Sequence, residues 1–396
     1  MQQLNKVSTL ETLTCFSAAR CKRLKINLHM DIVIYLCSIV NITAVCYGNI
    51  QRSILDDCLV ACSSSKCKKS LFYGEENYMK LHPYLKKIVP LLMLGIVLTA
   101  CTTTRQAKQH PELSKPVLIE HPERFFWEIK GNKGSVYVLG TVHVADKSFY
   151  PLEKNVLRAF DNADRLVSEI GGEAEMEALT AELQTVIIQN MNADPEKSLL
   201  NVLSEDELAF LYETVGDDTV HQLALFNPWI FDTVLSQLLM NRAGLHPEDG
   251  IDMYLMQRAK NKKIEALDTT QQQIAVLSYG TFEDQLAILK DSIQSLRDID
   301  QSIAKLHRIR DLYLGNNRKG LGDLLVELFL EIPASFSKKK AQSYIDMMLT
   351  DRNRIWAQKF DEYLHEGGNT FVFAGSAHFL GKSSVFEIMR QKNMLE

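Results

Sequence analysis

Short runs of residues that are apolar, or that alternate between apolar and polar, occur near both ends of the C-terminal three quarters of the chain. Residues 125–130 and 135–139 have the composition of two strands, and the glycine-bounded segment 131–134 between them predicts a hairpin turn. The run 165–170 predicts a third strand, which two glycines close. The run 370–374 is an unbroken series of apolar and β-branched residues, which is typical of a buried central strand.

Between these strands, from 174 to about 362, the pattern is mainly helical. Two segments within it, 204–207 and 281–284, have the form of capping boxes, which mark helix starts. One further strand is predicted at 263–267, directly after a helix over 252–260.

Two shorter helices are predicted outside this block, at 152–162 and 383–391. Strands at both ends with a long helical block between them predict an α/β fold. We expect a central mixed sheet built from N- and C-terminal strands, with a large helical insertion that covers it.

A segment with the layout of a signal peptide precedes the strands. Lys80, Lys86 and Lys87 are followed by an apolar run of 13 residues, 88–100. That run is shorter than the ~20 residues of a bilayer span but suits a signal peptide. It ends in Leu-Thr-Ala-Cys, with the cysteine at Cys101, and this resembles a bacterial lipobox. The resemblance implies cleavage before Cys101 and lipid attachment to it, which would anchor the protein stably.

This pattern predicts four parts in the chain. We expect residues 1–78 to be an upstream extension that the mature protein lacks, 79–100 a lipoprotein signal peptide, 101–123 a lipid-anchored tether, and 124–396 the folded domain. The expected location is extracytoplasmic, by lipid anchor in the cell membrane or the outer membrane. An internal hydrophobic helix with a chance cysteine is the alternative interpretation.

Composition narrows the class of protein further. All eight cysteines lie at or before Cys101, which excludes a disulfide framework for the rest of the chain. Lys and Arg number 44 against 49 Asp and Glu, a net charge of −5, so we expect no nucleic-acid partner. The hydrophobic content of 46% argues against a multi-span membrane protein.

Two of the predicted strands end in the same way. The strand at 135–139 runs into Gly-Thr-Val-His, ending at His143, and the strand at 370–374 runs into Gly-Ser-Ala-His, ending at His378. Each glycine lets the backbone turn or approach closely, and each histidine projects from the carboxyl edge of the sheet, where ligands bind in open α/β folds. Glu169 ends a third strand, so its carboxylate can reach the same edge.

Two imidazoles and a carboxylate on rigid elements can bind a divalent metal ion and leave positions open for water. One GxxH pattern is weak, because a lone histidine is more often packed or solvated than a ligand. The duplication at matching strand ends favours a metal site formed by His143, Glu169 and His378.

These motifs resemble the TraB/GumN type of protein, a family that includes the animal TIKI proteases, which cleave Wnt. Its hallmarks are two GxxH motifs, a glutamate after the next strand and a late arginine, and they fall on His143, His378, Glu169 and Arg352. Arg352 is favoured over Arg354 because the family usually has an Arg-Asn pair there. The resemblance covers roughly 124–392 and includes, in order, Asn227-Pro228-Trp229, Ala243-Gly244-Leu245, Gly250-Ile251-Asp252 and Leu267-Asp268-Thr269.

The resemblance implies a metal-dependent peptidase that uses manganese or cobalt, with zinc as a further option. Glu169 and Arg352 are its expected catalytic residues, Arg352 by holding a substrate carboxylate or an oxyanion. A surface ion pair with Asp351 or Asp361 is the alternative for Arg352.

Four other residues carry side chains of the types that bind or support a metal ion. Asp252 and Asp268 are candidates to support the metal ligands, although a helix cap and a strand-end turn are the favoured interpretations. Asp268 also departs from the family, which often has glutamate there. His246 and His365 lie in polar, loop-like stretches and are expected to be solvated.

Two main functions follow from these residues. The first is a membrane-tethered metal-dependent hydrolase acting on extracytoplasmic peptides or proteins. The alternative is a non-enzymatic lipoprotein that binds or sequesters a peptide signal. A structural lipoprotein with a relic site is the third and least favoured reading.

Overall fold

The computed structural model describes residues 115–189, 195–260, 262–330, 333 and 335–396. Within them, six strands form one sheet in the order β1-β2-β3-β6-β4-β5. Their bounds are β1 (Val117–Glu120), β2 (Phe126–Lys130), β3 (Gly134–Thr141), β4 (Arg165–Ser168), β5 (Ile264–Ala266) and β6 (Gly368–Gly375).

The sheet is mixed, and its parallel part positions the functional residues. β1, β2 and β3 pair antiparallel, whereas β6 pairs parallel with both β3 and β4, and β4 pairs parallel with β5. Thr141 and Gly375 are register partners, so β3 and β6 end at the same level. The expected mixed sheet of N- and C-terminal strands is thereby confirmed, and the apolar β6 is its buried centre.

The predicted hairpin of β2 and β3 is confirmed, but the start of the fold was placed too late. β1 lies inside the segment 101–123 that was expected to be a tether, and it pairs with β2 at the edge of the sheet. Three of its four residues are half-buried and Glu120 is exposed, which is a weak signal in sequence, and only the register with β2 makes them a strand. Residues 1–114, which contain the expected signal peptide and Cys101, lie outside the described residues.

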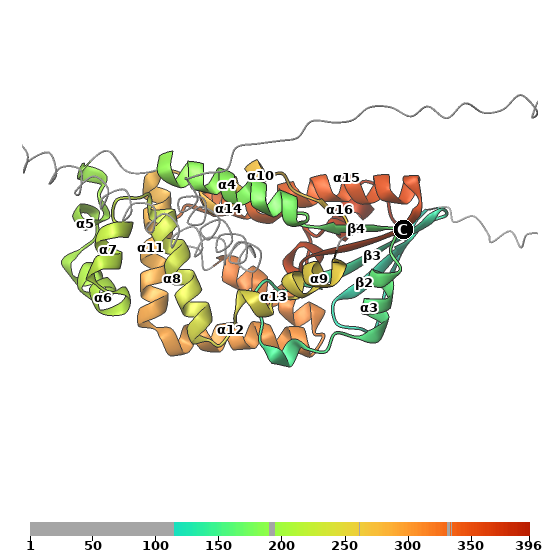
Figure 1. The fold of residues 1–396 in the computed structure, drawn as a ribbon, viewed down its shortest axis with the longest axis horizontal. Helices are drawn as coiled ribbons and strands as arrows, with labels where there is room; N and C mark the ends of the chain where they lie inside the picture. Colours follow the sequence, from blue (N-terminus) through green and yellow to red (C-terminus); the bar gives the residue numbers. More distant parts are fainter. Residues whose placement is uncertain (1–114, 190–194, 261, 331–332, 334) are drawn as a thin grey trace, which may run out of the picture. The chain divides into compact units, whose positions relative to one another are not determined.

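Helices cover both faces of the sheet. Neighbouring residues of a strand point to opposite faces. Phe160 of α3 packs against Phe371 on one face, and Phe386 of α16 packs against Trp127 on the other. Helix α15 also contacts β3 and β6 (Figure 1). These helices are α3 (Lys154–Asp161), α15 (Asp351–Glu366) and α16 (Val385–Gln391).

The helical insertion is confirmed, with both predicted capping boxes present at Ser204 and Thr281. It has a hydrophobic core of its own, distinct from that around the sheet, and Met256 packs against both. Its helices are α4 (Glu173–Gln189), α5 (Leu199–Val202), α6 (Glu205–Val215), α7 (Asp217–Leu223), α8 (Pro228–Arg242), α9 (Ile251–Ala259), α10 (Thr270–Leu277), α11 (Phe282–Arg297), α12 (Ile299–Leu314), α13 (Arg318–Leu330) and α14 (Lys338–Ile345), followed by a π-helical turn (Asp346–Thr350). In the described part of the chain, no helix has the length and hydrophobicity of a membrane span.

A carboxylate inside the helical insertion makes its stability depend on pH. Burial raises the pKa of Asp232 on α8 to about 6, and the Ser292 hydroxyl, which donates to it at 2.5 Å, offsets this only in part. The unfolded chain loses this proton near pH 4 and the folded chain only near pH 6. We therefore expect the free energy of unfolding to fall by about 3 kcal/mol as pH rises through this interval, a dependence that Asp232→Asn would abolish.

Urea unfolding at a series of pH values tests this expectation. Asp232→Asn should be more stable than the wild type at pH 7, with the difference vanishing below about pH 4. Glu213→Gln, an exposed acid on α6, is the matched control and should leave the pH dependence unchanged. Parallel pH profiles for the wild type and Asp232→Asn would contradict the assignment.

Candidate functional site

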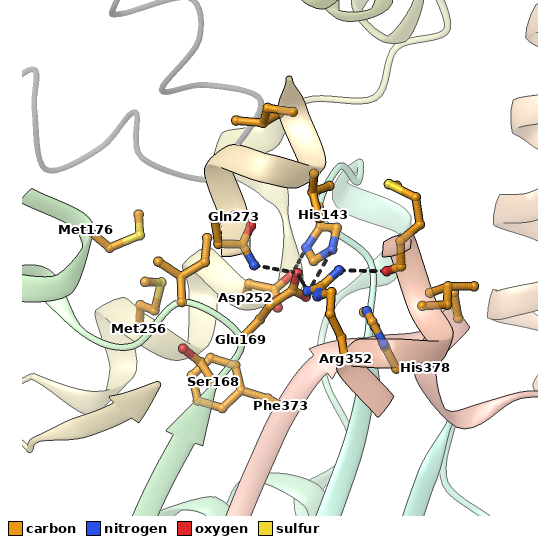
Figure 2. A pocket seen from close by; sticks show the side chains of 17 residues that line it. His143, Ser168, Glu169, Met176, Asp252, Met256, Gln273, Arg352, Phe373 and His378 are labelled. Carbon is orange, nitrogen blue, oxygen red and sulfur yellow. Dashed lines mark hydrogen bonds and ion pairs between the residues drawn. The ribbon is translucent and has the colours of Figure 1, made fainter. Parts of the chain in front are cut away.

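A pocket of about 320 Å³ opens where β3, β4 and β6 end (Figure 2). His143 lies two residues beyond β3, and Glu169 directly follows β4. His378 lies in the short helix Ser376–Phe379 that follows β6. All three side chains line this one pocket, together with Arg352. The structure therefore brings together the residues that the two GxxH motifs and their partners singled out.

His143 is oriented by Asp252, which comes from the first turn of α9. Its Nδ1 donates to Asp252 Oδ2 at 3.0 Å, and Thr141 donates to the other oxygen of the same carboxylate at 2.6 Å. This bond directs Nε2 towards Glu169 Oε2, 3.7 Å away. Burial alone would lower the pKa of His143, but the charges of Asp252 and Glu169 outweigh it and raise the pKa to about 9.

The interpretation of Asp252 as a helix cap was wrong. Gly250 occupies the cap position of α9, and Asp252 is buried against Thr141 and His143. A buried carboxylate in a first helical turn is not distinguishable from an exposed one by its position in the sequence. Only the packing of α9 behind the end of β3 assigns it to the site.

His378 is held more tightly than His143, because it is buried. Its Nδ1 lies 2.5 Å from Asn353 Oδ1, and its ring packs on Trp356 with centroids 4.0 Å apart. The Asn353 amide nitrogen donates to the Ser383 carbonyl, so the amide oxygen faces the imidazole. Nδ1 is then the donor and Nε2 carries the lone pair. Burial and the charge of Arg352 lower the pKa of His378 to about 3.

The two carboxylate oxygens of Glu169 differ in their hydrogen bonding. Oε1 accepts hydrogen bonds from Arg352 and, at 3.2 Å, from Gln273. Oε2 is buried and accepts no hydrogen bond among the described residues. Burial would raise the pKa of Glu169, but Arg352 above all, and then the two histidines, bring it well below its usual range. The carboxylate is therefore ionised and exposes one oxygen to His143.

Arg352 is buried and is shared between two carboxylates. It donates to Glu169, to Asp268 at 2.7 Å and to the carbonyl of Met348 in the π-helical turn at 2.9 Å. Asp268 is fixed in turn by Trp356 at 2.7 Å. All three guanidinium nitrogens are thus engaged by the protein, so this arginine holds Glu169 and Asp268 in place while it lines the pocket.

Two sequence interpretations are corrected here. The surface ion pair considered for Arg352 is instead made by Arg354, which contacts Asp351 at 2.5 Å. Asp268 is a buried partner of Arg352 and not merely a strand-end turn residue. His365 is exposed as expected, whereas His246 is half-buried, and neither lines the pocket.

The glycine of the second GxxH motif, Gly375, allows the His143 imidazole to lie close to the backbone at the end of β6. A Cβ at Gly375 would lie 3.0 Å from His143 Nε2 and 3.7 Å from the His378 ring. Its φ is −48°, a value that any residue adopts, so backbone conformation is not the reason for glycine. The missing side chain leaves the space in which the two imidazoles come near each other.

Two residues of the site carried no sequence signal. Gln273 from α10 bridges Glu169 and Asp268, and Trp356 from α15 supports both Asp268 and His378. Asn353 was noted only as part of an Arg-Asn pair. Within the described residues, no three His, Cys, Asp or Glu side chains already stand as a ligand set around one point.

Comparison with known proteins supports the family resemblance. Residues 125–395 match the TraB/PrgY/gumN family. An uncharacterized protein of Treponema pallidum (strain Nichols) is 34% identical over 310 residues, which cover 77% of this chain and 90% of that protein. The uncharacterized protein YbaP is 25% identical in Shigella flexneri and 24% in Escherichia coli (strain K12), each over 267 residues, 66% of this chain and 90% of the relative. No solved structure matches. Since the match spans every strand of the sheet except β1 and includes both GxxH motifs, this chain belongs to the TraB/PrgY/gumN family.

Proposed function

We propose that this protein is a metal-dependent hydrolase of peptides or proteins, with one divalent ion held by His143, Glu169 and His378. The observation that carries the proposal is Glu169 Oε2, a buried carboxylate oxygen that accepts no hydrogen bond among the described residues. It lies 3.7 Å from His143 Nε2, too far for a hydrogen bond. Two ligands that each stand about 2.1 Å from one ion are separated by roughly 3 to 4 Å, so this spacing suits a shared cation.

The surroundings of the two imidazoles support the same assignment. Each ring has its Nδ1 occupied, by Asp252 in one case and Asn353 in the other, and each therefore directs Nε2 into the pocket. Metal-binding histidines are commonly fixed in this way by a hydrogen bond on the second nitrogen. Two imidazoles and one carboxylate suit manganese, cobalt or zinc.

The chain's own groups have definite parts in such a reaction. A divalent ion bound there would polarise a scissile carbonyl and lower the pKa of a water molecule. Arg352 keeps Glu169 ionised and turns its second oxygen towards His143. Asp252 fixes the His143 tautomer, and Asn353 fixes that of His378. We assign Arg352 a positioning role, because its nitrogens are already committed to Glu169, Asp268 and the backbone.

One observation favours sequestration of a peptide as the second candidate function. Among the described residues, two carboxylates line the pocket: Glu169, which is hydrogen-bonded to Arg352, and Asp252, which is hydrogen-bonded to His143. Each carboxylate therefore already has a protein partner that competes with a role as general base. A site of this kind could bind a peptide without hydrolysing it, and the two functions differ in one measurable outcome.

Incubation of the purified full chain with a diverse peptide library separates the two functions. With manganese, cobalt or zinc added, we expect new peptide termini by mass spectrometry, and chelator-treated protein should produce none. Tight binding of a peptide that stays intact under all three metals would instead establish sequestration.

We further propose that the protein is tethered outside the cytoplasm through a lipid on Cys101. The support is the order of lysines, apolar run and lipobox-like tetrapeptide at 80–101. Cys101→Ser is expected to move the protein from the membrane fraction to the soluble fraction and to abolish incorporation of a labelled fatty acid. Cys67→Ser, upstream of the expected cleavage site, is the control and should change neither. Persistent fatty-acid labelling of Cys101→Ser would refute the tether.

A further inference from the structure

The pocket has a charged end and an apolar end. His143, Glu169, Arg352 and His378 gather at one end, as Figure 2 shows. The remaining wall is mainly apolar, and six of its side chains are partly exposed to solvent. They come from the end of β4, from α9 and α10, and from the π-helical turn: Ile170, Met256, Val276, Leu277, Met348 and Leu349.

We infer that this apolar wall binds a large uncharged side chain of the substrate, so that the preferred substrate is a peptide with an apolar residue next to the bond that is cleaved. The inference rests on the proposed function for the position of the cleaved bond. It adds the substrate class and the residues that select it, of which Met256 and Leu277 are the principal ones.

The packing of Met256 and Leu277 indicates that the apolar wall is a fixed part of the pocket. Met256 packs against both hydrophobic cores, so it is fixed from two sides, yet its side chain still borders the pocket. Leu277 is the last residue of α10, whose fourth residue, Gln273, donates a hydrogen bond to Glu169. Leu277 of the apolar wall and the Gln273 amide that holds Glu169 are therefore carried on the same helix, which fixes their separation.

Charge at the pocket's polar end argues against a charged substrate side chain. Arg352 is the one Lys or Arg among the described residues that line the pocket, and it is committed to Glu169 and Asp268. Asp252 and Glu169 are bonded to His143 and Arg352. A lysine or aspartate of the substrate would thus be desolvated against apolar walls without a dedicated partner, which is strongly unfavourable.

The wall is also adaptable. Met256 and Met348 face the pocket from different elements, and methionine side chains are unbranched and fill irregular gaps. The pocket volume of about 320 Å³ lies at the small end for ligand sites. We therefore expect the pocket to bind substrate leucine, methionine and phenylalanine side chains equally well. It should exclude charged side chains without preferring one side-chain shape.

Blocked pentapeptides test the inference with the full chain. The series is acetyl-Ala-Ala-X-Ala-Ala-amide, with X as Leu, Met, Phe, Lys or Asp, and both binding by calorimetry and cleavage by mass spectrometry are measured in the presence of manganese. Peptides with Leu, Met or Phe should bind at least about tenfold more tightly than those with Lys or Asp. Where cleavage occurs, it should follow the same order.

Met256→Glu is expected to weaken binding of the Leu peptide by about tenfold or more and to narrow or reverse its advantage over the Lys peptide. Met256→Leu is the matched control and should retain the wild-type preference. Leu277→Glu should act in the same direction, and it covers the case in which Met256→Glu does not fold. Metal content should be unchanged in every folded variant, because neither side chain is a ligand.

The outcomes are distinguishable. Binding that prefers apolar X, with the bound peptide left intact under manganese, cobalt and zinc, would contradict the proposed hydrolase and still support the subsite. Equal handling of charged and apolar X, an unchanged preference in both glutamate variants, or no binding of any peptide would overturn the subsite. Equal cleavage of charged and apolar peptides would overturn the subsite but support the proposed hydrolase.

Discussion

Replacing His143 with alanine is expected to reduce bound metal in the purified full chain from near one ion per molecule to near none. His143 is half-exposed, so its removal should leave the fold intact. The loss should arise because one of the three proposed ligands disappears while Glu169 and His378 remain in place. His378→Ala should have the same effect. Metal content by mass spectrometry after dialysis, with unfolding followed in parallel, measures both.

Matched controls make this expectation specific to the pocket. His365→Ala and His246→Ala remove histidines that do not line the pocket and should leave metal content unchanged. Asp252→Asn keeps the ligand but weakens its support, and metal affinity should fall by about 10- to 100-fold. Wild-type metal content in both His143→Ala and His378→Ala would remove the basis of the proposed site.

Arg352→Ala should destabilise the protein by about 3–5 kcal/mol, because it leaves two buried carboxylates next to each other without their cation. The side chains of Glu169 and Asp268 are 13% and 0% exposed, so solvent screens their charges little. The pKa of Asp268 is already raised by burial, even with Arg352 present. Urea unfolding at pH 7 measures the loss.

Arg354→Ala is the control, two residues along the same helix. Arg354 and Asp351 form an ion pair between side chains that are 55% and 60% exposed. Such pairs contribute about 0–1 kcal/mol, so the loss should be small. Asp268→Asn added to Arg352→Ala should recover part of the stability, since one of the two uncompensated charges is gone. Equal losses for Arg352→Ala and Arg354→Ala would mean that the buried network does not stabilise the fold.

Local sequence patterns predicted the structure correctly where a residue's neighbours in the sequence determine its conformation. The capping boxes at Ser204 and Thr281 formed as predicted, because a cap is made by residues three apart. The hairpin between β2 and β3 formed for the same reason. β1 was missed because its four residues, which are half-buried or exposed, form a strand only when they pair with β2.

The site was predictable only in part, for a related reason. The two GxxH motifs were visible because each is local to a strand end, and the structure brings His143 and His378 to one pocket. The network behind them was not visible. Arg352 joins Glu169 and Asp268 across 183 and 84 positions of sequence, and Asp252 lies 109 positions from His143.

The sequence by itself determined the α/β class, the family and the set of side chains able to meet at the carboxyl edge of the sheet. These depend on periodicity and on motifs that span a few residues. Tertiary structure alone decided that Arg352 is a buried clamp, that Asp252 and Asn353 orient the imidazoles and that apolar residues complete the pocket. Burial and hydrogen bonding between distant segments depend on how α9, α10 and α15 pack against the strand ends, and no local pattern encodes that packing.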